Sequence, residues 1–123
     1  MKNGKVGYAV VGLGVGKKHA KAAAESKNAD LIAVCDLLQE KLDVITTDYP
    51  DTITYTDFDE MLKNPDIDCV SICVPSGMHA DFACKALYAG KNVLVEKPID
   101  ITLEAAQSIV DCMKETGKKV ACV

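Results

Sequence analysis

A short run of glycines near the amino end has the spacing of a phosphate-binding turn. The run consists of Gly12, Leu13, Gly14, Val15 and Gly16. It joins an apolar stretch to an alanine-rich one, so the first glycine permits a tight bend, the second lets a phosphate group approach, and the helix N-terminus attracts the charge. The usual spacing places the third glycine where Lys17 stands. The turn is therefore a shortened variant, and a purely structural turn is the alternative.

An acidic residue ends the next apolar stretch, about 20 residues after the glycines. At this position the side chain of Asp36 would accept hydrogen bonds from the ribose hydroxyls of an adenine dinucleotide. Its charge repels a 2′-phosphate, and Leu37 and Leu38 supply no basic replacement. We therefore expect NAD rather than NADP, with an aspartate that only caps the following helix as the alternative.

A further group of polar and rigid residues follows the central apolar run. The group is Val74, Pro75, Ser76 and His79. Pro75 has no N–H to contribute to a sheet and marks the end of a strand, after which Ser76 can cap a helix. His79 falls in the first turn of that helix, where it can contact a cofactor or substrate. A solvated or capping histidine is the alternative.

Two adjoining opposite charges, Glu96 and Lys97, directly follow the next apolar run and precede Pro98. A lysine there can bind a substrate hydroxyl or polarise a carbonyl, which makes Lys97 the candidate catalytic residue. Glu96 can hold the ribose on the nicotinamide side of a dinucleotide. An ion pair that only stabilises the turn is the alternative.

These residues lie between stretches that alternate in strand and helix patterns. Strands are predicted over 5–11, 30–35, 53–55, 69–74, 92–95 and 119–123, and helices over 18–26, 38–47, 57–63, 78–89 and 102–116. The connections are too short for anything but right-handed parallel crossovers. We therefore expect one α/β domain over residues 1–123: a doubly wound parallel sheet (Rossmann fold) of about six strands in the order 3-2-1-4-5-6.

Charge and composition argue against several other classes of protein. The net charge of −4 argues against a nucleic-acid partner, and no run reaches the roughly 20 apolar residues of a membrane span. The six cysteines lie in strand-like and helix-like runs without a CxxC pair, so we expect buried, reduced thiols of a cytoplasmic protein. His19 and His79 are far apart in the sequence, and we expect no metal site.

Together these motifs resemble the N-terminal domain of the glucose-fructose oxidoreductase and inositol dehydrogenase family (Gfo/Idh/MocA). The resemblance covers essentially the whole chain. It rests on the glycine turn followed by His19 and Ala20, on the residues around Asp36, and above all on segments 75–80 and 89–98. The common family form of the glycine turn is one residue longer.

The resemblance implies a two-domain oxidoreductase that moves a hydride between NAD(P) and a carbon of a sugar or cyclitol. Gly12 and Gly14 would cradle the pyrophosphate, Asp36 would bind the adenosine ribose, and Pro75 and His79 would lie along the cofactor. Glu96 and Lys97 would reach the nicotinamide ribose and the substrate. The peptide bond before Pro98 is often cis in this family.

The chain stops within a predicted strand, so we expect a larger protein whose second domain lies outside it. In the family that domain supplies most of the substrate pocket, the histidine credited with proton transfer and the homo-oligomer interface. The chain alone would then bind cofactor and perform little chemistry. A stand-alone NAD-binding or nucleotide-sensing module is the main alternative, and another Rossmann enzyme resembling dihydrodipicolinate reductase is a third interpretation.

Overall fold

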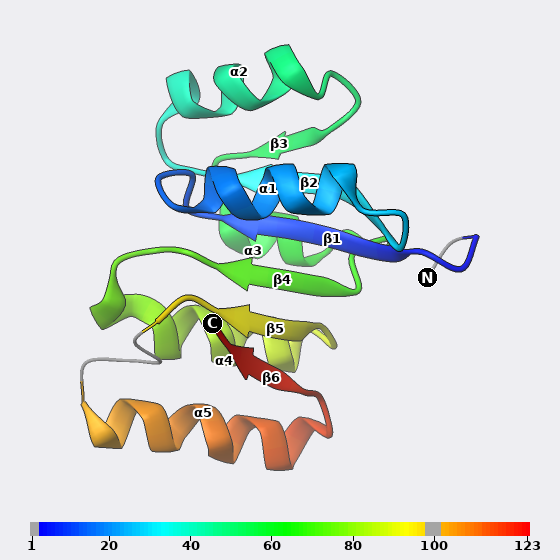
Figure 1. Cartoon of the computed structure of the whole chain (residues 1–123). Coiled ribbons are helices and arrows are strands. Elements are labelled where there is room, and N and C mark those ends of the chain that lie inside the picture. Colours follow the sequence, from blue (N-terminus) through cyan, green and yellow to red (C-terminus); the bar gives the residue numbers. More distant parts are fainter. Residues whose placement is uncertain (1–2, 98–101) are drawn as a thin grey trace.

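The computed structural model, which describes residues 3–97 and 102–123, is built on one parallel sheet with helices on both faces (Figure 1). Its six strands are hydrogen-bonded in the order β3-β2-β1-β4-β5-β6, and every neighbouring pair is parallel. This arrangement confirms the predicted Rossmann fold. The peptide bond before Pro98 lies outside the described residues.

The elements follow the predicted alternation closely. The strands are β1 (Val6–Val11), β2 (Ala29–Cys35), β3 (Ile53–Tyr55), β4 (Cys69–Ile72), β5 (Asn92–Val95) and β6 (Val120–Cys122). The helices are α1 (Gly16–Glu25), α2 (Gln39–Asp48), α3 (Phe58–Leu62), α4 (His79–Tyr88) and α5 (Leu103–Thr116), with a 3₁₀ turn η1 (Ser76–Met78) before α4.

Several boundaries differ from the prediction by a single residue, and three differences lie near the candidate site. The helix α1 begins at Gly16 rather than at residue 18, and β4 ends at Ile72 rather than at residue 74. The chain then passes through η1, so α4 proper begins only at His79. All three differences fall at the carboxyl edge of the sheet, where loop geometry rather than apolar periodicity determines the path of the chain.

Each face of the sheet has its own apolar core, because successive residues of a strand point to opposite faces. In β1, Ala9 and Val11 pack on the face that carries α3, α4 and α5, whereas Val10 packs on the face that carries α1 and α2. The first core is the larger and takes in residues from all three of its helices. The second is centred on Leu13, Ala20, Val34, Leu42 and Ile45.

The cysteines correct the expectation of uniformly buried, reduced thiols. Cys84 of α4 and Cys112 of α5 form a disulfide with their Cα atoms 5.7 Å apart. The expectation is wrong for this pair because the two residues are 28 apart in sequence, and only the packing of α4 against α5 brings them together. Four cysteines are free: Cys35 is buried, Cys69 and Cys73 are partly buried, and Cys122 is exposed.

In the described part of the chain, no helix combines the length and the apolar character that crossing a bilayer requires.

Candidate functional site

Gly12 directly follows β1 and turns the chain sharply against the neighbouring strand. Its φ of +88° lies in the left-handed region, and a Cβ there would approach the carbonyl oxygen of Cys73 to 2.6 Å. Its amide donates to the carbonyl of Cys35 over 2.9 Å. Both the backbone conformation and the packing against the end of β4 therefore require glycine at this position.

The other two glycines of the turn have different roles. Gly16, the first residue of α1, is buried, and a Cβ on it would lie 2.8 Å from Val10 Cγ1 and 3.3 Å from Cys73 Cβ. It therefore permits the close packing of helix on strand that the third glycine provides in dinucleotide-binding turns. Gly14 is exposed, and no atom lies within 4 Å of its Cβ position. The shortened turn thus keeps the tight bend of the first glycine and the helix packing of the third, and it leaves open space at Gly14.

The start of α1 is open to an anion. Within the described residues no side chain caps this helix, and its first turn carries no acidic residue. Lys17 and Lys18 are exposed beside it, and so is Val15, whereas Leu13 is fully buried and anchors the turn in the smaller core. Uncapped N–H groups and the positive end of the helix dipole favour a phosphate here.

Asp36 is attached directly to the glycine turn. Its Oδ2 accepts a hydrogen bond from the Leu13 amide and its Oδ1 accepts one from the Leu38 amide, both over 2.9 Å. Leu38 is the residue before α2, and no side chain in the described residues caps that helix, so the bond to Leu38 is not the helix cap of the alternative interpretation. Each carboxylate oxygen keeps a second lone pair. The side chain can therefore still accept hydrogen bonds from ribose hydroxyls next to the phosphate turn.

The loop after β4 is held from inside by a histidine. His79 is 2% exposed, and its Nε2 lies 2.7 Å from the carbonyl oxygen of Val74. This burial excludes the solvated alternative, while contact of His79 with a cofactor stays a prediction. Pro75 is exposed at the tip of the loop. Ser76 does not cap α4 as expected, because the 3₁₀ turn intervenes and Met78 occupies the position before the helix.

Glu96 points toward α1. Its Oε2 lies 2.7 Å from His19 Nε2, and within the described residues it forms no ion pair with Lys97. The simple Glu96–Lys97 pair that was the alternative is therefore absent from residues 3–97 and 102–123. Lys97 is exposed at the end of the first described segment.

Behind Glu96 lie polar residues to which the sequence analysis gave no role in the site. Nδ1 of His19 lies 3.0 Å from Ser71 Oγ, and Ser71 is in turn hydrogen-bonded to the hydroxyl of Tyr8. Ser71 is fully buried in the middle of an apolar strand. A hydroxyl in such a place requires a partner, and that requirement was the available signal.

Cys73 lies against the same pair. One ligand atom from each of His19, Cys73 and Glu96 lies within 4.8 Å of the others, a cluster that sequence spacing did not reveal. Burial and then the negative charge of Glu96 raise the pKa of Cys73 to about 12, so the thiol is protonated at neutral pH. His19 and Glu96 satisfy each other by a hydrogen bond, and no buried side-chain polar atom in the described part of the chain lacks a partner.

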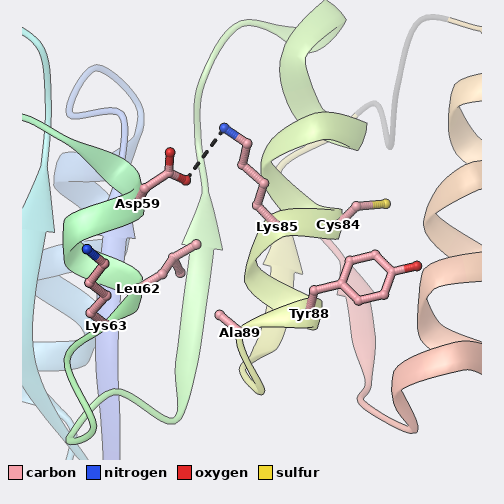
Figure 2. Close-up of a pocket in the computed structure, with 7 residues that line it drawn as sticks. All are labelled: Asp59, Leu62, Lys63, Cys84, Lys85, Tyr88 and Ala89. Atoms are coloured by element: carbon pink, nitrogen blue, oxygen red, sulfur yellow. Dashed lines mark ion pairs between the residues drawn. The ribbon is translucent and has the colours of Figure 1, made fainter.

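Two surface hollows lie away from the glycine turn. One of about 450 Å³ lies between α3 and α4, where Lys85 and Asp59 form an ion pair over 3.5 Å (Figure 2). It contains none of the predicted site residues. A second, of about 420 Å³, lies beside α1 and is lined in part by Tyr8, His19 and Leu94.

Comparison with known proteins places this geometry in a family. A family model described as "Oxidoreductase family, NAD-binding Rossmann fold" matches residues 6–123. An inositol 2-dehydrogenase from Rhizobium meliloti (strain 1021) is 34% identical over 116 residues, which cover 94% of this chain and 34% of that protein. A scyllo-inositol 2-dehydrogenase (NAD(+)) from Bacillus subtilis (strain 168) is 36% identical over 115 residues, or 92% and 34% of the two chains.

A solved structure shows the same likeness in three dimensions. The scyllo-inositol dehydrogenase from Lactobacillus casei with bound NAD(H) and scyllo-inositol superposes with a TM-score of 0.89 at 33% identity. The match covers 96% of this chain and 36% of that one. The chain therefore spans about a third of the length of the curated relatives it matches.

Proposed function

Because the chain belongs to the Gfo/Idh/MocA family of oxidoreductases and is an NAD-binding domain of that family, we propose that it forms the cofactor half of a polyol dehydrogenase. The enzyme would transfer a hydride between NAD and a hydroxyl-bearing carbon of a cyclitol, sugar or sugar derivative. The names of the relatives, which include inositol 2-dehydrogenase and D-glucoside 3-dehydrogenase, support this substrate class.

One contact carries the proposal: the hydrogen bond between Asp36 Oδ2 and the Leu13 amide. It joins the residue expected to bind the adenosine ribose to the turn expected to bind the pyrophosphate. In NAD these two groups are adjacent, and the open start of α1 lies at the same edge of the sheet. The Asp36 carboxylate and the open start of α1 are thus placed to bind the adenosine ribose and the pyrophosphate of the same dinucleotide.

The remaining residues would follow the cofactor along the carboxyl edge of the sheet. Val74 and Pro75 would contact the cofactor beyond the pyrophosphate, in a loop that the hydrogen bond from His79 holds in place. Glu96 would accept hydrogen bonds from the nicotinamide ribose. When bound, NAD supplies the hydride acceptor, and the protein binds and orients it. Open parallel sheets bind ligands at this edge, at the switch point where the connections that leave β1 and β4 turn to opposite faces of the sheet.

Lys97 would contact the substrate. Its ammonium group would donate a hydrogen bond to the oxygen on the reacting carbon, which orients the alcohol and polarises the carbonyl in the reverse reaction. Its exposure at the end of β5 suits a side chain that reaches out of the cofactor domain toward a substrate.

NAD would be preferred over NADP. The Asp36 carboxylate repels a 2′-phosphate, and the following residues Leu37 and Leu38 are exposed and uncharged. A 2′-phosphate would therefore meet one negative charge with no basic side chain from this turn to balance it.

We further propose that the activity belongs to a longer, cytoplasmic, homo-oligomeric protein whose second domain completes the substrate pocket. The lengths of the relatives support the second domain, and the four free cysteines support a reducing compartment. The Cys84–Cys112 disulfide argues against a reducing compartment, because only four of the six cysteines are then reduced. The negative net charge supports a partner other than nucleic acid.

The test is NAD⁺ reduction by the longer protein with myo-inositol, scyllo-inositol and a glucoside as substrates. We expect turnover that Lys97→Ala abolishes while NAD⁺ affinity stays nearly intact. The control Lys114→Ala removes an exposed lysine from α5 and should leave turnover unchanged. Unchanged turnover in Lys97→Ala would remove Lys97 from the mechanism, and NAD⁺ binding without turnover on any polyol would favour a sensing module.

A further inference from the structure

Four polar side chains from four parts of the chain form one hydrogen-bonded series across the sheet. Tyr8 of β1 bonds Ser71 of β4, Ser71 Oγ lies 3.0 Å from His19 Nδ1 of α1, and His19 Nε2 lies 2.7 Å from Glu96 after β5. Ser71 is fully buried, and the side chains of His19 and Glu96 are 12% and 20% exposed. The series thus runs from the interior of the sheet to its carboxyl edge.

The donors and acceptors in this series run in one direction. An ionised Glu96 can only accept, so the proton of a neutral imidazole lies on Nε2 and leaves Nδ1 as an acceptor. Ser71 then donates to Nδ1 and accepts from the Tyr8 hydroxyl. Burial raises the pKa of Tyr8 and outweighs the opposing hydrogen bond to Ser71, so the phenol remains a donor. Every member is satisfied without water at the buried serine.

This arrangement restricts the carboxylate of Glu96. A glutamate at the end of a strand has several accessible rotamers, and a short charge-assisted hydrogen bond selects one of them. His19 cannot turn away, because its other nitrogen is bonded to a serine in the centre of β4. The position of Glu96 is therefore determined by β1 and β4 through the imidazole ring.

We propose that His19 is a positioning residue that holds the Glu96 carboxylate in the orientation that receives the nicotinamide ribose of NAD. This inference rests on the proposed function, since it requires NAD to lie along the carboxyl edge. His19 would act through Glu96 and would not itself touch the reacting carbon. Its loss should therefore affect the nicotinamide half of the cofactor and leave the adenosine half unchanged.

The experiment compares NAD⁺ with ADP, which carries only the adenosine half, as ligands of the 123-residue chain. We expect His19→Ala to weaken NAD⁺ binding roughly tenfold, as loss of a charge-assisted hydrogen bond does, and to leave ADP binding unchanged. His19→Gln, which can still donate to Glu96, should recover most of the NAD⁺ affinity. Lys21→Ala, an exposed change on the same helix, is the matched control.

A double-mutant cycle tests the route of the effect. If His19 acts through Glu96, His19→Ala should cause no further loss of NAD⁺ affinity in a Glu96→Ala background. Additive losses, or an equal fall in ADP affinity, would overturn the proposal, because His19 would then be supporting the glycine turn. NAD⁺ affinity that requires added Zn²⁺ and disappears in EDTA would also overturn it, in favour of metal coordination by His19, Cys73 and Glu96.

The outcomes separate this inference from the function on which it rests. If the unaltered chain binds neither NAD⁺ nor ADP, the proposed function fails. If it binds both and His19→Ala binds them equally well, only the positioning role fails.

Discussion

The two faces of the sheet hold their helices by different means. On the face that carries α3, α4 and α5, contacts are apolar, extensive and supplemented by the Cys84–Cys112 disulfide. On the face that carries α1, the apolar core is smaller, the helix approaches the strands through Gly16, and a partly buried polar series runs from Tyr8 to Glu96.

This difference separates stability from function. Apolar contacts tolerate small displacements. By contrast, the approach of Gly16 to Val10 leaves no room even for a Cβ, and a hydrogen bond of 2.7 Å has a narrow geometry. The candidate residues at the glycine turn, Asp36 and Glu96 all depend on the second kind of contact. We therefore expect changes on the α4–α5 face to lower stability and changes on the α1 face to lower cofactor affinity.

The largest expected effect on stability is a truncation in the larger core. Leu87 of α4 is 1% exposed, and Leu87→Ala should lower the free energy of unfolding by about 2–5 kcal/mol through lost burial and a cavity. Urea unfolding followed by circular dichroism measures the change, and Val44→Ala on the exposed side of α2 is the control. The NAD⁺ affinity of the folded variant should be unchanged. A loss of NAD⁺ affinity without a loss of stability would contradict the assignment of stability to this face and cofactor binding to the other.

The disulfide should contribute the next largest effect. Closing a loop between residues 28 apart stabilises a chain by about 3.6 kcal/mol in the chain-entropy model. Reductant or the double change Cys84→Ala/Cys112→Ala should therefore lower the unfolding midpoint. NAD⁺ affinity should not change, because both cysteines lie on the helices remote from the glycine turn. An identical midpoint with and without reductant would show that the pair is reduced in solution, as the sequence had indicated.

Two glycine substitutions sharpen the comparison within a single turn. Gly12→Ala should cost about 1–3 kcal/mol from its left-handed φ alone, with a further cost from the contact with Cys73, and should also abolish NAD⁺ binding. Gly14→Ala should leave stability within about 0.5 kcal/mol, because its Cβ meets no atom, yet should weaken NAD⁺ binding by occupying the approach of the phosphate. Thermal unfolding and calorimetry check the two predictions, and intact NAD⁺ affinity in Gly14→Ala would contradict the phosphate role.

The smallest of the expected effects concerns the choice of cofactor. Asp36→Ala removes the acceptor for the adenosine ribose and should weaken NAD⁺ binding about tenfold, as loss of a hydrogen bond to a charged group does. It also removes the charge that repels a 2′-phosphate, so the gap between NAD⁺ and NADP⁺ should narrow. Parallel titrations measure both affinities, and an unchanged ratio between them would show that Asp36 only joins the glycine turn to α2.

Much of the fold and part of the site follow from local patterns in the sequence. The alternation of strands and helices predicts a doubly wound parallel sheet, because short crossovers are right-handed, and 3-2-1-4-5-6 is the order of the dinucleotide-binding form of that fold. The positions of the glycine turn and Asp36 are also predictable from the sequence. Each lies directly after a strand, and the carboxyl ends of the parallel strands β1 and β2 are adjacent. The geometry shows that Gly16 keeps the helix-packing role despite the shortened spacing.

The parts that escaped prediction depend on contacts between distant segments. His19 and Glu96 are 77 residues apart and meet only because α1 packs over β1 and β4, while Glu96 follows β5, the neighbour of β4 in the sheet. Cys84 and Cys112 meet only because α4 and α5 share a face. The polar series and the disulfide both require the register between helices and strands, which apolar periodicity does not define.

The most direct test of the central claim is a calorimetric titration of this chain with NAD⁺ and NADP⁺ in parallel. The account predicts saturable binding of NAD⁺ at one site, with NADP⁺ clearly weaker and with Gly14→Ala reducing the NAD⁺ affinity. Equal binding of the two cofactors would contradict the role of Asp36. Binding of neither would contradict the claim that this edge of the sheet is a cofactor site.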